Sequence, residues 1–135
     1  MLLALQLNNL LEDEAEDDTT PDQFSIGDKF GVATSTVITS DPFPITGINV
    51  TVSFTATGGT IDVNSDGNFQ TSRDVVNNDT VRARHTSSAL NSTATDTTVT
   101  GGGVSDIFTS VTAGAANPSE TGTIAVIMRN RLLLQ

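Results

Sequence analysis

The residues of this chain best suited to chemistry lie in one short stretch that could bind a calcium ion. Asp62, Asn64 and Asp66 occupy alternate positions and Gly67 follows, which is the D-x-N-x-D-G spacing that opens a calcium-binding loop. Oxygen atoms at alternate positions can surround a hard cation, and glycine lets the backbone bend. The twelfth position of such a loop should be a glutamate, but here it is Arg73. The missing ligand favours a hairpin turn, so we assign no metal.

A second candidate is His85, the only histidine in the sequence. A single histidine on an apolar strand face is more often packed and hydrogen-bonded than catalytic. Catalysis would need a nucleophile and an orienting group, and no spacing in the sequence marks either of them. The chain also has no cysteine, which removes the thiol nucleophile and the thiolate metal site. We predict no catalytic residue, no cofactor and no enzymatic activity.

The composition argues against other classes of function. The net charge is −10 and only six residues are Lys or Arg, so the chain lacks the clustered cations that bind phosphate backbones, and we predict no nucleic-acid partner. Several of the acids form a block at residues 12–18, which normally stays solvated. Without cysteine, any core must be held by packing alone. Without Trp or Tyr, the domain lacks the buried Trp and the tyrosine corner of antibody-type domains.

The elements that must position these residues are predicted to be β-strands. Around His85, the side chains of Val81 and Ala83 share its face, because side chains alternate along a strand. Arg82 and Arg84 fall on the opposite face, where we expect them to lie in water. This pattern is typical of a strand with one buried face.

Further strands are expected on both sides of this one. The segments with strand character are residues 24–26, 34–39, 48–54, 61–63, 93–99 and 104–111. Residues 48–54 alternate most regularly. In the last segment the apolar residues fall on both parities, Val104 and Phe108 on one and Ile107 on the other, which predicts a bulge or burial on both faces.

Turn residues separate these strands. Residues 77–79 (Asn-Asn-Asp) and 65–68 (Ser-Asp-Gly-Asn) predict hairpins, and the three glycines at 101–103 predict a chain reversal. Residues 41–44 contain two prolines, which cannot lie in a central strand, so we expect a turn or an edge crossing there.

The same stretch of strands resembles a known family. NDTVRAR at residues 78–84, TSSA at 86–89 and GGVSDIFT at 102–109 resemble the recurrent signature of bacterial and phage immunoglobulin-like β-sandwich modules. The sequence departs from that signature at Asn78, where the family usually has glycine, and at Thr100 and Gly101, where an apolar residue usually precedes the glycines. The resemblance implies an all-β, immunoglobulin-like antiparallel β-sandwich. It leaves the binding surface unspecified, because a fold so widely reused does not define a function.

The chain outside the sandwich is predicted to form two apolar terminal strands and two linkers. We divide it into an N-terminal anchor strand (1–11), an acidic linker (12–23), the sandwich (24–112), a small-residue linker (113–122) and a C-terminal anchor strand (123–135). The N-terminal leucines also fit a helix face, although the acids that follow would disfavour a helix C-terminus. The anchor residues are Leu3, Leu5, Leu7, Ile124, Val126, Met128, Leu132 and Leu133.

These apolar ends suggest an assembly device, since a monomer rarely leaves such patches in water. The N-terminal segment is interrupted by polar residues and is far shorter than a membrane span, so we predict no membrane partner. The two ends could pair with each other or with another subunit.

The family resemblance implies a phage virion structural protein, either a capsid decoration or cement protein or a tail-associated component. We therefore expect a homo-oligomer, contacts with other virion proteins, and a location in the virion after assembly in the host cytoplasm. The alternative is a module that binds carbohydrate or a host surface, with a host-surface glycan as its partner, which exposed aromatic residues would favour.

Overall fold

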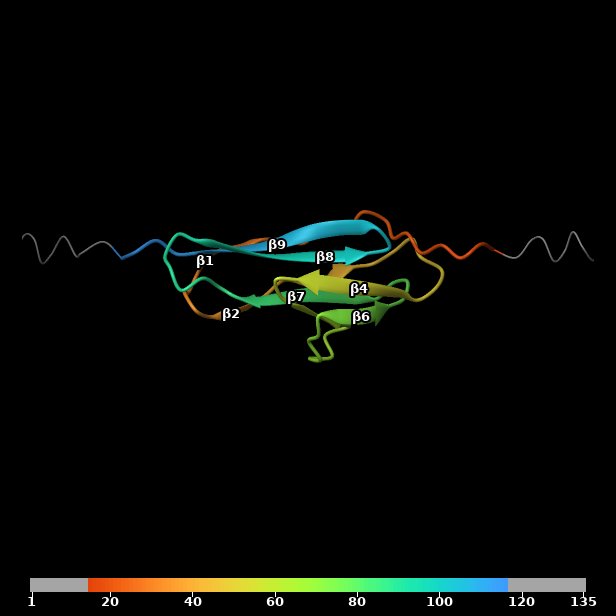
Figure 1. The fold of residues 1–135 in the computed structure, drawn as a ribbon, viewed down its shortest axis with the longest axis horizontal. Coiled ribbons are helices and arrows are strands. Elements are labelled where there is room, and N and C mark those ends of the chain that lie inside the picture. The colour runs from red at the N-terminus through yellow and green to blue at the C-terminus, as the bar shows by residue number, and fades with distance from the viewer. Residues whose placement is uncertain (1–14, 117–135) are drawn as a thin grey trace, which may run out of the picture.

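The computed structural model describes residues 15–116, which form a two-layered β-sandwich (Figure 1). Its strands are β1 (Lys29–Val32), β2 (Val37–Thr39), β3 (Phe43–Pro44), β4 (Val52–Thr57), β5 (Thr60–Val63), β6 (Ser72–Val75), β7 (Thr80–Thr86), β8 (Ala94–Gly101) and β9 (Val104–Thr112). The predicted all-β fold is confirmed. In this part of the chain, no helix has the length and apolar character needed to cross a membrane.

One layer is a five-stranded sheet in the order β1-β9-β8-β4-β6, and the other is built around β7. Arg84 of β7 pairs with Thr39 of β2 and with Thr60 of β5, so β2 and β5 lie on opposite edges of β7. β3 follows β2 along the same edge, where Pro44 removes no hydrogen bond from a central strand, as residues 41–44 predicted. One pair departs from the antiparallel pattern, because β1 runs parallel to β9.

The core lies between the two sheets and contains the apolar face of nearly every strand. In β4, Val52, Phe54 and Ala56 are buried and the residues between them are exposed. The core residues are Phe24, Ile26, Phe43, Ile45, Ile48, Val52, Phe54, Ala56, Ile61, Val63, Val75, Val81, Ala83, Val99 and Phe108. Each large apolar side chain buried in this way contributes roughly 1.5–3 kcal/mol to stability.

The hairpin between β8 and β9 forms at the glycines, as predicted. Gly102 and Gly103 have φ angles of 56° and 84°, the left-handed conformations that a tight hairpin turn requires. The predicted bulge is absent from the β8–β9 pair, which has no register shift, and β9 is not buried on both faces. The β1–β9 pair does have an irregularity, which lies in β1 between Phe30 and Val32. Phe108 and Ser110 face the interior, and Ile107 faces outward with 48% of its surface exposed. The inward positions accept small polar residues because these make hydrogen bonds inside the sandwich.

Two predicted strands differ from the structure. The strand predicted at residues 48–54 begins at Val52 and continues to Thr57, although Ile48 is buried in the preceding loop. Residues 24–26 are not in a strand, and the first strand begins at Lys29. Local alternation marks which residues are buried, whereas a strand also needs a hydrogen-bonded neighbour.

The turn at residues 77–79 is present, but it does not close a hairpin. Asn78 has a φ of 72°, as turn chemistry predicts. The turn joins β6 to β7, which lie in different sheets, because β6 pairs with β4. The loop at residues 64–71 similarly makes only one hairpin bridge, between Ile61 and Gln70, before the chain crosses to the other sheet.

Ordered contacts begin before the predicted domain boundary at residue 24. The backbone N–H of Asp22 donates to the carbonyl of Thr46 at 2.8 Å, and that of Asn49 donates to the carbonyl of Asp18 at 3.1 Å. A Cβ atom on Gly102 would lie 1.9 Å from the carbonyl oxygen of Thr19, so this segment needs a glycine beside it. The last part of the acidic segment therefore packs against the sandwich.

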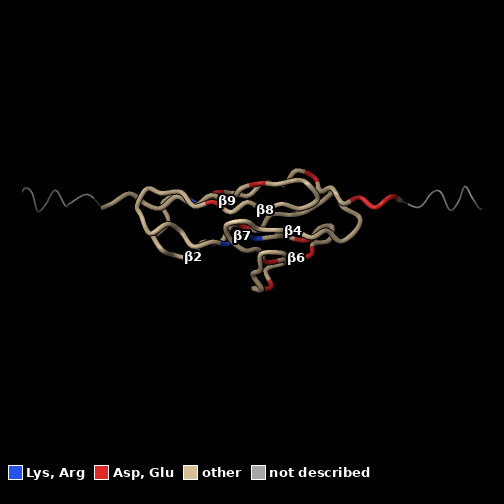
Figure 2. The backbone as a smooth tube through the Cα atoms, viewed as in Figure 1, with Lys and Arg blue, Asp and Glu red and all other residues tan. Residues whose placement is uncertain are grey.

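The described chain enters and leaves at opposite ends of the long axis of the sandwich (Figure 1). Figure 2 shows acidic residues gathered on the entering segment, and the exposed residues there are Glu16, Asp17 and Asp18. The predicted anchor strands at residues 1–11 and 123–135 lie outside the described residues.

Candidate functional site

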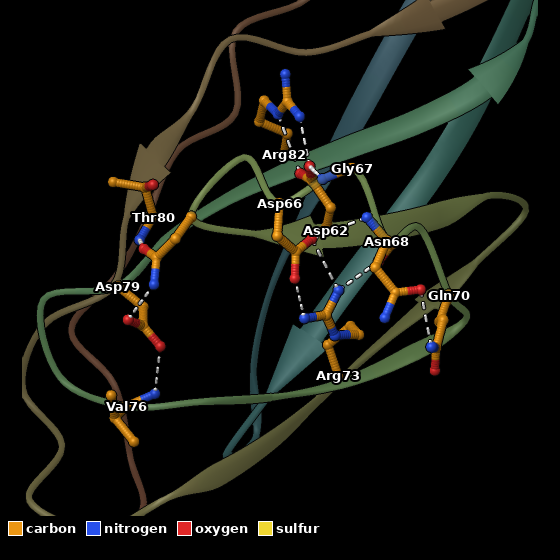
Figure 3. Close-up of polar contacts among 11 residues, drawn as sticks. Asp62, Asp66, Gly67, Asn68, Gln70, Arg73, Val76, Asp79, Thr80 and Arg82 are labelled. Atoms are coloured by element: carbon orange, nitrogen blue, oxygen red, sulfur yellow. Dashed lines mark hydrogen bonds and ion pairs between the residues drawn. The ribbon is translucent and has the colours of Figure 1, made fainter.

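The candidate site is the segment with calcium-loop spacing. Its two aspartates, Asp62 and Asp66, are each bound by an arginine (Figure 3). Asp62 lies on β5 directly opposite Arg82 of β7. The Asp62 carboxylate accepts a hydrogen bond from Arg82 Nε at 3.0 Å and a second, charge-assisted contact from Arg82 Nη2. The backbone N–H of Gly67 also donates to Asp62, at 3.2 Å. Asp62 is fully buried, and Arg82 has 26% of its side chain exposed.

Asp66 is held by the residue that replaces the expected calcium ligand. Arg73 binds it through both guanidinium nitrogens, with Nη2 at 2.6 Å and Nη1 at 3.2 Å. The N–H of Asn68 donates to the same carboxylate at 2.9 Å. These hydrogen bonds, led by that of Arg73, lower the pKa of Asp66 from 3.8 to about 2. We call Asp62, Asp66, Arg73 and Arg82 the acid–arginine cluster.

Asn64 points to a different partner from the two aspartates. Its amide nitrogen donates to the Asp79 carboxylate at 2.7 Å, and its side-chain oxygen accepts from the N–H of Thr80 at 3.0 Å. Asp79 also accepts from the N–H of Val76, which fixes the turn before β7. The three candidate calcium ligands, Asp62, Asn64 and Asp66, thus bind three different sets of protein groups. Their side-chain oxygens do not converge on a common point. Across residues 15–116, no group of three acidic, histidine or cysteine residues is placed to hold a metal.

The prediction that Arg82 and Arg84 of β7 lie in water is wrong, because a loop residue covers them. Phe69, in the loop after β5, covers them, with its ring centre 3.7 Å from the Arg84 guanidinium carbon and 5.5 Å from that of Arg82. Strand parity correctly places both arginines on the outer face. It carries no information about a loop that folds back over that face.

Arg84 differs from the other basic residues that the structure describes. Lys29, Arg73 and Arg82 each pair with a carboxylate, whereas the Arg84 guanidinium forms no ion pair among the described residues and contacts the Phe69 ring. Arg84 also borders a shallow depression of about 410 Å³ between β2 and the turn before β5. A guanidinium held beside an open depression can bind an anion, since its donors are already oriented.

His85 is packed and hydrogen-bonded between the sheets, as predicted. Its Nδ1 lies 2.8 Å from the Thr97 hydroxyl, and its Nε2 lies 2.7 Å from the Ser110 hydroxyl. The Thr97 hydroxyl donates its single proton to the carbonyl of Gly58, so Nδ1 must be the donor to Thr97 and Nε2 must accept from Ser110. We call His85, Thr97 and Ser110 the His85 cluster.

This environment favours the neutral imidazole. The His85 ring stacks on Phe108 with centroids 4.7 Å apart. Burial lowers the pKa of His85 below its ordinary value of 6.5, and the nearby Asp96 carboxylate opposes that shift in part. Both ring nitrogens are occupied by hydroxyls of the sandwich, so the fold fixes the orientation of the imidazole.

The pairing of Asp62 with Arg82 was not predicted from the sequence. Both residues lie on polar positions of their strands, but only the register of β5 against β7 brings them together. The predicted anchor residues, from Leu3 to Leu7 and from Ile124 to Leu133, lie outside the described residues. Comparisons of the chain with protein-family models, with curated protein sequences and with solved structures found no match.

Proposed function

We propose that this protein is a non-enzymatic structural component of a tailed-phage virion, which displays its β-sandwich and is anchored through its terminal segments. It serves as a capsid decoration or cement protein or as a tail-associated component. Its partners are further copies of itself or other virion proteins. The proposal draws on the resemblance to phage immunoglobulin-like modules and on the sandwich fold.

The observation that carries the anchoring role is the position of the two chain ends. The described chain leaves the sandwich at opposite ends of its long axis (Figure 1), and the sequence continues from each end into an apolar segment. Pairing between these two segments in one molecule would require them to return along the length of the domain. Pairing with a neighbouring subunit requires no such return. We therefore favour contacts between chains.

The test compares molar masses in solution by light scattering. We expect the full chain to be an oligomer and a chain trimmed to residues 15–116 to be a folded monomer. In the full chain, Val126→Asp together with Met128→Asp should abolish assembly, because a buried charge costs several kcal/mol. Ile107→Asp is the matched control, since Ile107 is exposed on the sandwich, and it should leave the oligomer intact. A monomeric full chain, or loss of the oligomer only in the Ile107 variant, would refute terminal anchoring.

A second candidate function is a module that binds host-surface carbohydrate. The Arg84–Phe69 contact beside the depression favours it, because a sugar carboxylate could pair with the Arg84 guanidinium. Exposed Phe30 adds an aromatic surface elsewhere on the domain. On a glycan array, binding to uronic or sialic acids should be lost in Arg84→Gln and kept in Lys29→Gln. Absence of acidic-sugar binding by the unaltered protein would remove this candidate.

A further inference from the structure

The segment of residues 23–32, which we call the N-terminal arm, runs parallel to β9 over its whole length. Beyond the hydrogen-bonded ladder of β1, three side-chain contacts continue the attachment toward the N-terminus, and one backbone contact extends it at the other end. The contacts are Gln23 Nε2 to the Ser105 carbonyl at 3.5 Å, the Ile26 N–H to Asp106 Oδ2 at 2.7 Å, the Thr109 N–H to Asp28 Oδ1 at 2.9 Å, and the Ala113 N–H to the Val32 carbonyl at 2.9 Å. The backbone pairs between them are Lys29 with Ser110, Phe30 with Val111 and Val32 with Thr112.

Two of these attachments are stronger than ordinary backbone hydrogen bonds. Asp106 and Asp28 use carboxylate oxygens to accept from backbone N–H groups, and hydrogen bonds to ionised acceptors are about twice as strong as neutral ones. They extend the attachment beyond the short strand β1, which has only four residues. The arm is therefore joined to β9 along an extended line of contacts.

The direction of the chain makes this line of contacts resist pulling. The chain enters at one end of the sandwich, runs along β9 in the arm, and leaves from the end of β9 at the opposite end (Figure 1). Tension between the two chain ends pulls the arm and β9 in opposite directions along their length. The contacts are then loaded together in shear, and none can separate alone.

In the same geometry, the rest of the domain lies outside the path of the applied force. The arm and β9 contain the first and last strands of the sandwich in sequence. Once the contacts of Asp18 with Asn49 and of Asp22 with Thr46 have separated, the load passes directly from the arm to β9. Strand β6, at the far edge of the five-stranded sheet, contributes to stability but lies off this path. Mechanical resistance and thermodynamic stability should therefore depend on different residues.

We propose that the domain is a tension-bearing link, in which the N-terminal arm and β9 form the load-bearing pair between two attachment points. This function goes beyond anchoring and display, because it concerns what the domain does once both ends are held. Forced unfolding is governed by an unfolding rate, so its measure is the lifetime of the folded domain under constant force.

The test is single-molecule force spectroscopy with two attachment geometries. Because the chain has no cysteine, introduced cysteines supply unique handles. Ala15→Cys with Ala116→Cys loads the pair in shear, whereas Ala33→Cys with Gly114→Cys pulls on the arm and β9 from the same end and separates their contacts one after another. We expect the shear geometry to survive at least about tenfold longer at equal force, since sequential rupture breaks one hydrogen bond at a time. Equal lifetimes, or a longer lifetime in the second geometry, would overturn the proposal.

A pair of variants separates mechanical from thermodynamic effects. Asp106→Ala, pulled in shear, should shorten the lifetime by about tenfold or more, because it removes a hydrogen bond to a charged group. Val75→Ala, in β6, creates a cavity at a fully buried position and should lower the free energy of unfolding more than Asp106→Ala does. Its loaded lifetime should nevertheless change less. The opposite ranking of lifetimes would overturn the proposal, and it would leave the oligomer measurement unaffected.

Discussion

The His85 cluster and the acid–arginine cluster satisfy polar groups in two different ways. His85 lies between the sheets and binds only neutral hydroxyls, those of Thr97 and Ser110. Asp62 is as deeply buried, yet it is paired with an arginine on the outer face of β5 and β7. Arg82 keeps 26% of its side chain exposed, so the pair retains contact with water.

The difference shows where this fold tolerates charge. A charge between the sheets would lose its hydration without compensation, and the imidazole there stays neutral. On the outer face, a loop and a facing arginine replace the lost water around Asp62, which makes the ion pair acceptable. Four predictions test this contrast, beginning with the largest effect.

Removing Asp62 should cause the largest loss of stability. Asp62→Ala leaves Arg82 and the Gly67 N–H without their partner in a covered site. Breaking such a pair by removing one member costs roughly 3 kcal/mol, which chemical denaturation at pH 7 would measure. The double variant Asp62→Leu with Arg82→Leu should lose less than the single variant, because it leaves no unpaired charge. A double variant less stable than the single one would contradict this account.

Acidification should destabilise the protein through His85. Its folded pKa lies below the unfolded value of 6.5, so the unfolded chain binds the proton first. The stabilisation is complete above pH 6.5 and is lost as the pH falls toward the folded pKa, with a slope of at most about 1.4 kcal/mol per pH unit.

Thermal denaturation between pH 7 and 5 would measure this loss, with His85→Gln as the control. Glutamine keeps a donor and an acceptor for the two hydroxyls but does not titrate. Since His85 is the only histidine, the variant should show a much flatter pH dependence. An unchanged slope in the variant would show that the neutral interior cluster is not the origin of the effect.

In the outer cluster, Asp66 should remain ionised to unusually low pH. Hydrogen bonds from Arg73 and from the N–H of Asn68 lower its pKa to about 2, so its contribution to stability is present above 3.8 and is lost as the pH falls toward 2. Carboxyl-carbon NMR should show this midpoint. In Arg73→Gln the midpoint should move up toward 3.8, and a midpoint that stays near 2 would assign the shift to another group.

The smallest expected effect is that of calcium. Because Asp62, Asn64 and Asp66 each bind a different protein group, millimolar Ca²⁺ should leave the melting temperature unchanged. A calcium-dependent rise that disappears in Asn64→Ala would show that the loop can rearrange around a cation. That result would break the contrast between the two clusters.

Local patterns of the sequence predicted much of the fold. Alternation placed Val81, Ala83 and His85 on the buried face, and the glycines at 102 and 103 predicted the hairpin between β8 and β9. The calcium-loop spacing could also be recognised in the sequence. Arg73 at the twelfth position already indicated that one calcium ligand is missing. These features depend on residues that are close in the chain, so no partner strand has to be known.

The tertiary structure alone decided which strands pair and what their outward side chains meet. The parallel pairing of β1 with β9, the transfer of β6 to the sheet of β4, and the contact of Asp62 with Arg82 join residues distant in sequence. Alternation cannot specify these partners, because each strand edge offers the same backbone donors and acceptors to any neighbour. The choice depends on packing both sheets around one core, which is a property of the whole domain.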